Sequence, residues 1–206
     1  RDGDTVAIGG TGGGIAEPTD LIYALEKRFL ETSSPRGLTF IHVTGLGDRA
    51  DGGMCHLAHE GLVKRNIGGH YDYIPKMAQL ASENKIEAYN LPQGVLSQLF
   101  RETAAKRSGL VTHVGLRTFV DPRVEGGKLN EITKEDLVKV IEFEGQEKLF
   151  YRSYDCNVAF LRGTSADEDG NVSMEEEAAL LDNLAIAQAV RNNGGKVFVQ
   201  VKRIVQ

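Results

Sequence analysis

The sequence predicts an α/β fold, with a mainly parallel open sheet flanked by helices. Three observations support this prediction. Short apolar runs rich in Val, Ile and Leu alternate along the chain with stretches of helical periodicity. Glycine, at 24 of 206 residues, is well above its average share, and the glycines gather in clusters between these runs. Buried strands joined by helices and shaped loops are typical of a parallel sheet.

The N-terminal half begins with a strand, a loop and a helix. Thr5–Ile8 is a short, partly β-branched apolar run that ends in glycines, and apolar residues recur at helical spacing behind Pro18. A proline and glycine turn precedes Leu38–Val43, which predicts a second strand. A helix expected over Ile74–Asn84 leads to a short strand at Ile86–Tyr89. The apolar positions of the first helix are Leu21, Ile22, Leu25 and Phe29.

The C-terminal half continues the alternation. Val95–Ala105 predicts an amphipathic helix, and Leu110–Val114 and Val158–Leu161 predict strands. A long helix is expected over Glu175–Arg191, stopping at a glycine pair before a final strand at Val197–Val201. We expect one mainly parallel sheet to contain Thr5–Gly9, Leu38–Val43, Ile86–Tyr89 and Val197–Val201.

Composition limits the classes of function. Lys and Arg total 24 against 29 Asp and Glu, and the net charge of −5 lacks the basic footprint that a nucleic-acid partner needs. No apolar run approaches the length of a membrane span, so no membrane association is expected. Cys55 and Cys156 lie far apart in a chain large enough to fold without disulfides, which favours a reducing compartment. We therefore expect a cytoplasmic protein.

We interpret residues 1–206 as one domain. Asp121–Phe150 interrupts the alternation with glycines and charges, and we expect it to be an excursion from the sheet rather than a domain boundary. The chain begins without Met and its last residues include a predicted strand. We therefore expect it to be one part of a larger protein.

The strongest local signal is the run Gly9–Gly14, with the sequence Gly-Gly-Thr-Gly-Gly-Gly, between a strand and a helix. Backbone without side chains can approach a ligand and direct N–H groups at an anion. A dinucleotide fingerprint would need glycine at Ile15, and a phosphate loop would need Lys and then Ser or Thr after Gly14. The alternative to an anion cradle is a tight turn that lets the helix pack on the sheet.

Two clusters suggest metal sites but have the wrong spacing. Asp167–Asn171 would begin a calcium loop only with glycine at Val172 and an acid at Ala178, so we interpret Asp169-Gly170 as a tight turn. The other cluster consists of Cys55, His56, His59 and Glu60. It lacks the His-Glu-x-x-His spacing and a later pair of ligands, so packing and hydrogen bonding are the expected roles. We expect no bound metal, and we find no serine nucleophile motif.

Gln93 lies in the segment Asn90–Gly94, which ends a strand and begins a helix. Pro92 fixes the approach of the chain, and Gly94 leaves the backbone open. An uncharged amide at such a corner can stabilise a developing oxyanion without titrating. The alternative is a glutamine that only caps its helix, and the residues alone leave both interpretations open.

Together these segments resemble the α half of a family I coenzyme A transferase, of the fused acetate and propionate class. The similarity runs nearly from end to end. Thr11 stands where the family signature usually has an aromatic residue, and Pro18 falls one residue late. The segments with the resemblance are Asp2–Gly10, Gly61–His70, Leu91–Gly94, Thr118–Pro122 and Arg162–Asn171.

The resemblance implies a fold related to that of sugar-phosphate isomerases, and a ping-pong reaction. In such enzymes a glutamate attacks the acyl-CoA, an acyl anhydride forms, and CoA returns to give a glutamyl-CoA thioester that a carboxylate then resolves. Coenzyme A is a substrate there, and no cofactor is implied. Gln93 would face the oxyanion of the thioester. The residues implied to line the acyl or carboxylate pocket are Gly9, Gly10, Thr11, Gly12 and Gly13.

The nucleophilic glutamate of the family belongs to the β half, in a Glu-Asn-Gly motif. Here Glu83-Asn84 is followed by Lys85 at a predicted helix end, so we reject Glu83 as the nucleophile. The chain alone should be inactive, with a β domain or subunit, acyl-CoA and a short carboxylic acid as partners, and a homo-oligomer is expected. The alternatives are a sugar-phosphate isomerase or deaminase, and a non-enzymatic ligand-sensing domain.

Overall fold

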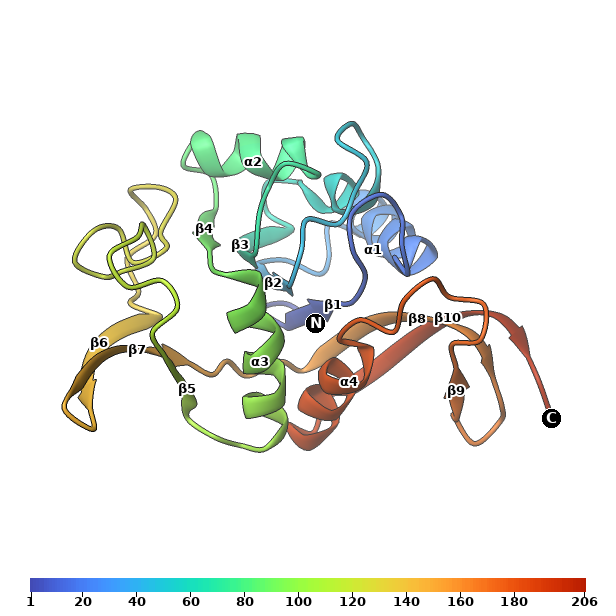
Figure 1. Cartoon of the computed structure of the whole chain (residues 1–206). Helices are drawn as coiled ribbons and strands as arrows, with labels where there is room; N and C mark the ends of the chain where they lie inside the picture. Colours follow the sequence, from blue (N-terminus) through green and yellow to red (C-terminus); the bar gives the residue numbers. More distant parts are fainter.

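A computed structural model, which describes residues 1–206, contains one large, mainly parallel sheet (Figure 1). The strand order is β10-β8-β1-β2-β3-β4, and every neighbouring pair on this path is parallel. A short strand, β9, pairs antiparallel with β8. The strands are β1 (Thr5–Ile8), β2 (Leu38–His42), β3 (Val63–Gly68), β4 (Glu87–Asn90), β8 (Val158–Ala166), β9 (Val172–Ser173) and β10 (Lys196–Ile204).

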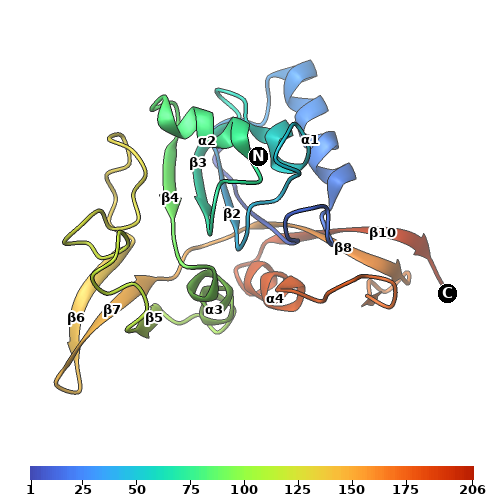
Figure 2. The same ribbon diagram turned by 45° about the horizontal axis from the view of Figure 1, so that its top comes forward.

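Helices cover both faces of this sheet (Figure 2). α1 and α2 lie on one face together with a 3₁₀ helix, η1, and α3 and α4 lie on the other. α1 follows Pro18 and ends at Ser33, whose left-handed conformation lets its N–H close the last turn on Phe29. The bounds are α1 (Thr19–Thr32), η1 (Gly53–Leu57), α2 (Pro75–Ser82), α3 (Gln93–Ala104) and α4 (Asn183–Asn192).

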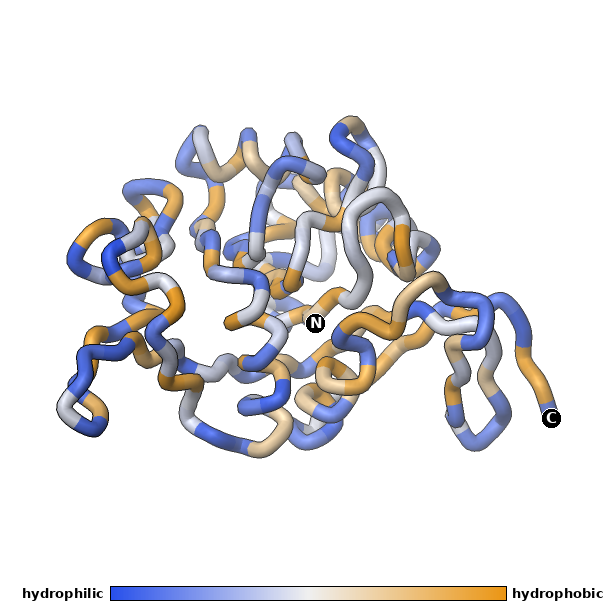
Figure 3. The backbone as a smooth tube through the Cα atoms, in the orientation of Figure 1, coloured by the Kyte–Doolittle hydropathy of each residue, from blue (hydrophilic) through white to orange (hydrophobic).

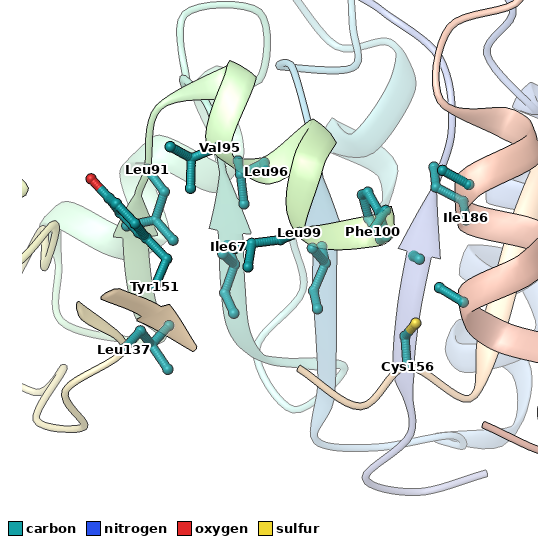
Figure 4. Packing of buried hydrophobic residues seen from close by; sticks show 14 of the residues in the cluster. Ile67, Leu91, Val95, Leu96, Leu99, Phe100, Leu137, Tyr151, Cys156 and Ile186 are labelled. Carbon is teal, nitrogen blue, oxygen red and sulfur yellow. The ribbon is translucent and has the colours of Figure 1, made fainter. Parts of the chain in front are cut away.

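Each face of the sheet has its own hydrophobic core. On one face, Ile22 of α1 and Met77 of α2 pack with Phe40 of β2, all three fully buried. On the other face, α3 and α4 present an apolar stripe to the strands, as Leu99 and Ile186 show in Figure 4. Buried side chains of this kind stabilise the fold by about 1.5–3 kcal/mol each. Hydrophobic and hydrophilic residues alternate along these helices, as the colours of the tube in Figure 3 show.

A second, antiparallel sheet of order β5-β7-β6 lies beyond the β4 edge (Figure 1). A turn at Gly145 joins β6 to β7, and the buried Tyr151 of β7 belongs to the same core cluster as α3. The stretch between β5 and β6 lies along β4, where Leu129 donates its N–H to the carbonyl of Ala88. These strands are β5 (Gly109–Thr112), β6 (Val138–Phe143) and β7 (Gln146–Arg152).

The predicted parallel sheet is confirmed, because β1, β2, β4 and β10 all belong to it. The predicted strand at Leu110–Val114 is confirmed as β5, which belongs to the second sheet. The excursion Asp121–Phe150 does leave the large sheet, and it contains β6 and the start of β7. The strand β3, which lies between β2 and β4, was missed. β3 is difficult to recognise because Lys64, Arg65 and Asn66 interrupt its apolar run.

The long helix predicted over Glu175–Arg191 is wrong in its first half, because α4 begins only at Asn183. The acidic side chains that open the predicted helix pair with the neighbouring strands instead. Glu176 binds Lys202 and Arg203 of β10, and Glu177 binds Arg162 of β8. These ion pairs, together with the N–H of Glu176 donated to Thr164 Oγ1, hold the segment against β8 and β10 as a series of turns instead of a helix.

No helix of the structure has the length and apolar character that a membrane span requires. Cys55 and Cys156 are both buried and both free.

Candidate functional site

Four loops meet at the carboxyl edge of the large sheet, where the parallel strands β1, β2, β3 and β4 end. These are the places where α/β proteins bind ligands. With strands about 4.8 Å apart, the ends of β1 and β4 are separated by roughly 14 Å. The site is therefore a long edge, with the glycine loop at one end and Gln93 at the other.

The Gly9–Gly14 loop folds back on itself as a small ring. Thr11 donates its N–H to the carbonyl of Ile15 at 2.9 Å, and Gly10 has a φ of +121°, which favours glycine. Thr44, after β2, donates its hydroxyl to Thr11 Oγ1 at 3.1 Å. Gly13 donates its N–H to the carbonyl of Gly47 at 2.8 Å. The loop is thus attached to the loop that follows β2.

The glycines of this loop serve two different purposes. A Cβ on Gly9 would lie 2.4 Å from Asn183 Oδ1, and one on Gly12 would lie 2.7 Å from the ring of Tyr73. At Gly13 and Gly14, by contrast, a Cβ would meet nothing within 4 Å. Gly9 and Gly12 therefore permit close packing, as the tight-turn alternative expects. Gly13 and Gly14 lie against open space, where a ligand can approach the backbone.

Gln93 is the first residue of α3 and its side chain is exposed. Pro92 occupies the cap position, and no side chain caps the helix, so Gln93 does not act as the cap. A Cβ on Gly69 would lie 2.4 Å from Gln93 Cγ and 2.1 Å from the carbonyl oxygen of Val43. The bare backbone of Gly69, directly after β3, is therefore what allows Gln93 to lean across the neighbouring strand end.

A buried histidine supports the loop after β2. His42 is fully buried, and burial lowers its pKa to about 4, so the ring is neutral. Its Nδ1 contacts the carbonyl of Thr44, which can only accept, so Nδ1 has the proton. Nε2 lies 3.1 Å from the Asn66 amide. Turning that amide over supplies the donor that Nε2 needs and pairs the otherwise unpaired Asn66 Nδ2.

A buried acid, Glu17, lies beside the glycine loop. Glu17 is 2% exposed, and burial raises its pKa to about 7. The backbone N–H groups of Gly14 and Gly47 act on it in the opposite direction. Sequence reasoning missed Glu17, because only the folded chain brings residue 17 to residue 47, and one acid next to the glycine run is a weak signal. His42, which lies in an apolar run, is expected from the sequence to be an ordinary hydrogen-bonded histidine, and its contacts with Thr44 and Asn66 agree with this.

The candidates set aside in the sequence analysis lie away from this edge. Glu83 is the exposed residue that ends α2, just before β4, so it lies at the opposite edge from Gln93. His56 and His59 both pair with Glu26 of α1. No group of three or more His, Cys, Asp or Glu side chains could hold a metal ion. In the turn after β8, Asp167 accepts the N–H of Asn171, and Gly170 has a φ of +86°.

Comparisons with known proteins agree with this architecture. The family model described as coenzyme A transferase matches residues 1–206. Acetate CoA-transferase YdiF of Escherichia coli K12 is 50% identical over 205 residues, which are 100% of this chain and 39% of that protein. Caffeate CoA-transferase of Acetobacterium woodii is 48% identical, covering 98% of this chain and 38% of its own length. The chain thus spans about two fifths of these relatives.

Solved structures give the same result. The crystal structure of YdiF from Escherichia coli O157:H7, a thioester complex with CoA, superimposes with a TM-score of 0.99 at 50% identity. The match covers 100% of this chain and 42% of the YdiF chain in that structure. Glutaconate coenzyme A-transferase of Acidaminococcus fermentans, at 15% identity and a TM-score of 0.74, shares the fold. By sequence over its whole length, and by fold, the chain belongs to the coenzyme A transferase family.

Proposed function

We propose that the protein of which this chain is part transfers coenzyme A from a short-chain acyl-CoA to acetate or a similar carboxylic acid. The observation that supports this most is an exposed, uncharged amide, Gln93, on the same sheet edge as an open glycine loop. The 50% identity to an acetate CoA-transferase supports the same activity. Coenzyme A is then a substrate, and the reaction needs no cofactor.

In the proposed reaction, a glutamate carboxylate attacks the thioester carbonyl, the thiolate of CoA leaves, and an acyl anhydride remains. The thiolate then attacks the glutamyl carbonyl, which releases the first acid and leaves a glutamyl-CoA thioester. A second carboxylate then attacks the glutamyl-CoA thioester and releases the thiolate, which leaves a second anhydride. The thiolate attacks the acyl carbonyl of this anhydride, which gives the new acyl-CoA and frees the glutamate. Each addition creates an oxyanion, and Gln93 would donate its amide N–H to it. Gly9, Gly10, Thr11, Gly12 and Gly13 would line the acyl or carboxylate pocket.

The nucleophile would come from a β half outside this chain. Glu83 belongs to the one Glu-Asn dipeptide of this chain. It lies at the edge of the sheet opposite to Gln93 and accepts a hydrogen bond from Gln79 at 2.8 Å. Several relatives of this chain are α subunits, such as the probable coenzyme A transferase subunit alpha of Bacillus subtilis, of which 78% is covered. A β domain or subunit is therefore the proposed partner, within a homo-oligomer.

The test uses the full-length protein with acetyl-CoA and propionate. We expect propionyl-CoA to form with ping-pong kinetics, and acyl-CoA alone to leave a CoA adduct on the enzyme, visible by mass spectrometry of its peptides. The adduct should map outside residues 1–206. An adduct on Glu83, or no transfer with any short acid, would contradict the proposal. Thermal stabilisation by sugar phosphates but not by acyl-CoA would instead favour an isomerase, a deaminase or a sensing domain.

A further inference from the structure

Glu17 occupies an unusual position for an acidic residue. It follows Ala16, which has a φ of +51°, and precedes Pro18 at the start of α1. Between these two constraints the side chain is directed inward and is 2% exposed. Its Oε1 is shielded from solvent and has no hydrogen-bond partner. A charged carboxylate with an unpaired, buried oxygen is costly, whereas a neutral acid is much less so.

The contacts of Glu17 place it between two loops. On one side, a Cβ on Gly10 would lie 3.2 Å from Glu17 Cγ and 3.1 Å from Glu17 Cα, so only glycine lets the loop rest on this residue. On the other side, the N–H groups of Gly14 and Gly47 act on the carboxyl. The same two loops are joined by the hydrogen bond from Gly13 to Gly47. Glu17 thus lies between the glycine loop and the loop after β2.

No positive charge compensates this carboxyl. The charged side chain that acts on it is Asp48, of the loop after β2, and its negative charge favours the protonated form. No basic side chain forms an ion pair with it: Arg49, in the loop after β2, pairs with Asp72, and Lys27 of α1 pairs with Glu31. If Glu17 ionises, a second negative charge therefore appears directly behind the backbone that faces the open end of the glycine loop.

We propose that Glu17 is a positioning residue that works as a neutral acid, holding the glycine loop in the shape that accepts a carboxylate substrate. When it ionises, it repels that carboxylate and weakens the contact between the two loops. The inference rests on the proposed function and adds a residue that controls substrate affinity. By linkage, a bound carboxylate must also make Glu17 harder to ionise.

The experiment measures KM for acetate and kcat of the full-length enzyme between about pH 5.5 and about pH 9, a range in which acetate stays ionised. In the wild type, KM should be flat below neutrality and then rise by about tenfold per pH unit, with little change in kcat. In Glu17→Gln, which keeps the shape of a neutral acid, KM should vary by less than about twofold over the same range. Glu31→Gln, an exposed residue on the same α1, is the matched control and should keep the wild-type rise.

A flat KM in the wild type, or an unchanged rise in Glu17→Gln, would overturn the proposal. If Glu17→Gln does not fold, Asp48→Asn keeps the acceptor oxygen that Asp48 Oδ1 offers to Ala50 and Gly52 and removes the charge. It should move the rise in KM to lower pH, and a midpoint that stays or moves upward would also overturn the proposal.

A binding measurement separates this inference from the proposed function. Acetate should raise the thermal midpoint of the wild type more at about pH 6 than at about pH 8, and equally at both values in Glu17→Gln. An enzyme that shows this pattern but transfers no CoA would refute the activity and retain the role of Glu17. An active enzyme that acetate stabilises equally at both pH values would retain the proposed activity and refute the role of Glu17.

Discussion

At the scale of single residues, the carboxyl edge of the sheet contains polar groups that the chain itself leaves without partners. Glu17 Oε1 and Asn183 Oδ1 are buried and unpaired, and Gln93 is exposed without a capping role. Unpaired buried polar groups are uncommon in folded proteins, and a ligand or a reaction that uses them is one explanation for them. Both Glu17 and Asn183 lie against the glycine loop, at Gly10 and at Gly9.

Replacing Gln93 tests the oxyanion role. In the full-length enzyme, Gln93→Ala should lower kcat by about 100-fold or more, roughly 2.7 kcal/mol, because one oxyanion donor is lost. KM and the thermal midpoint should change little, since the side chain is exposed and caps nothing. Gln98→Ala, an exposed glutamine on the same helix, is the control. Steady-state rates within about threefold of wild type would show that Gln93 is not an oxyanion donor.

Glu17 also makes stability depend on pH. Its folded pKa of about 7 lies above the ordinary value near 4.5, so between these values the folded chain keeps a proton that the unfolded chain has lost. Rising pH therefore favours unfolding across this window, by at most about 3 kcal/mol once pH exceeds 7. Urea denaturation at about pH 5 and about pH 8 should show this loss in the wild type and a smaller one in Glu17→Gln. Equal losses in both proteins would assign the effect to other groups.

At the scale of elements, the loops after β1, β2 and β3 hold one another in place through bare backbone. Gly12 lies under the ring of Tyr73, Gly69 lies under Gln93, and Gly45 donates its N–H to His70 Nε2 at 3.3 Å. Each contact joins two different strand ends. The shape of the site is therefore a property of the set of loops, and a change in one loop should be felt in its neighbour.

The substitution Gly12→Ala tests this coupling. Its Cβ would lie 2.7–2.9 Å from three ring atoms of Tyr73, a half-buried ring that also lies under the Arg49 guanidinium at 4.6 Å. We expect a loss of about 1–3 kcal/mol in the free energy of unfolding, because the ring must move. Gly94→Ala, where a Cβ meets nothing within 4 Å, should instead be neutral or raise stability by up to about 1 kcal/mol. Similar losses in both variants would exclude the contact with Tyr73 as the cause.

The elements also show which features a sequence can predict. Strands β1 and β2 were predictable because their apolar runs are continuous, and the Gly9–Gly14 loop because its pattern is local. The first half of the helix over Glu175–Arg191 was not, because acidic residues with good helix propensity pair with β10, which is distant in sequence. Glu17 and Gly69 were missed as site residues for the same reason, since their contacts come from other loops.

At the scale of the whole molecule, one side of the sheet edge is apolar and uncovered. Leu180, just before α4, and Leu184, in its first turn, are 68% and 72% exposed, and Ile15, directly after the glycine loop, is 40% exposed. The tube in Figure 3 shows apolar residues along this part of the chain. Large apolar residues gathered next to a site are typical of an interface. We expect the proposed β half to cover them, which would also close the site.

The isolated chain of 206 residues should therefore self-associate through this surface. Light scattering should give an average mass above 22.5 kDa that increases with concentration. Burying two leucines contributes about 3–6 kcal/mol, so the double variant Leu180→Ser, Leu184→Ser should weaken the association by roughly 100-fold or more. Leu30→Ser is the control, because Leu30 is 63% exposed on α1, which lies on the opposite face of the sheet. A wild-type chain that stays monomeric at high concentration would contradict the argument, and so would a control that dissociates the chain as strongly as the double variant.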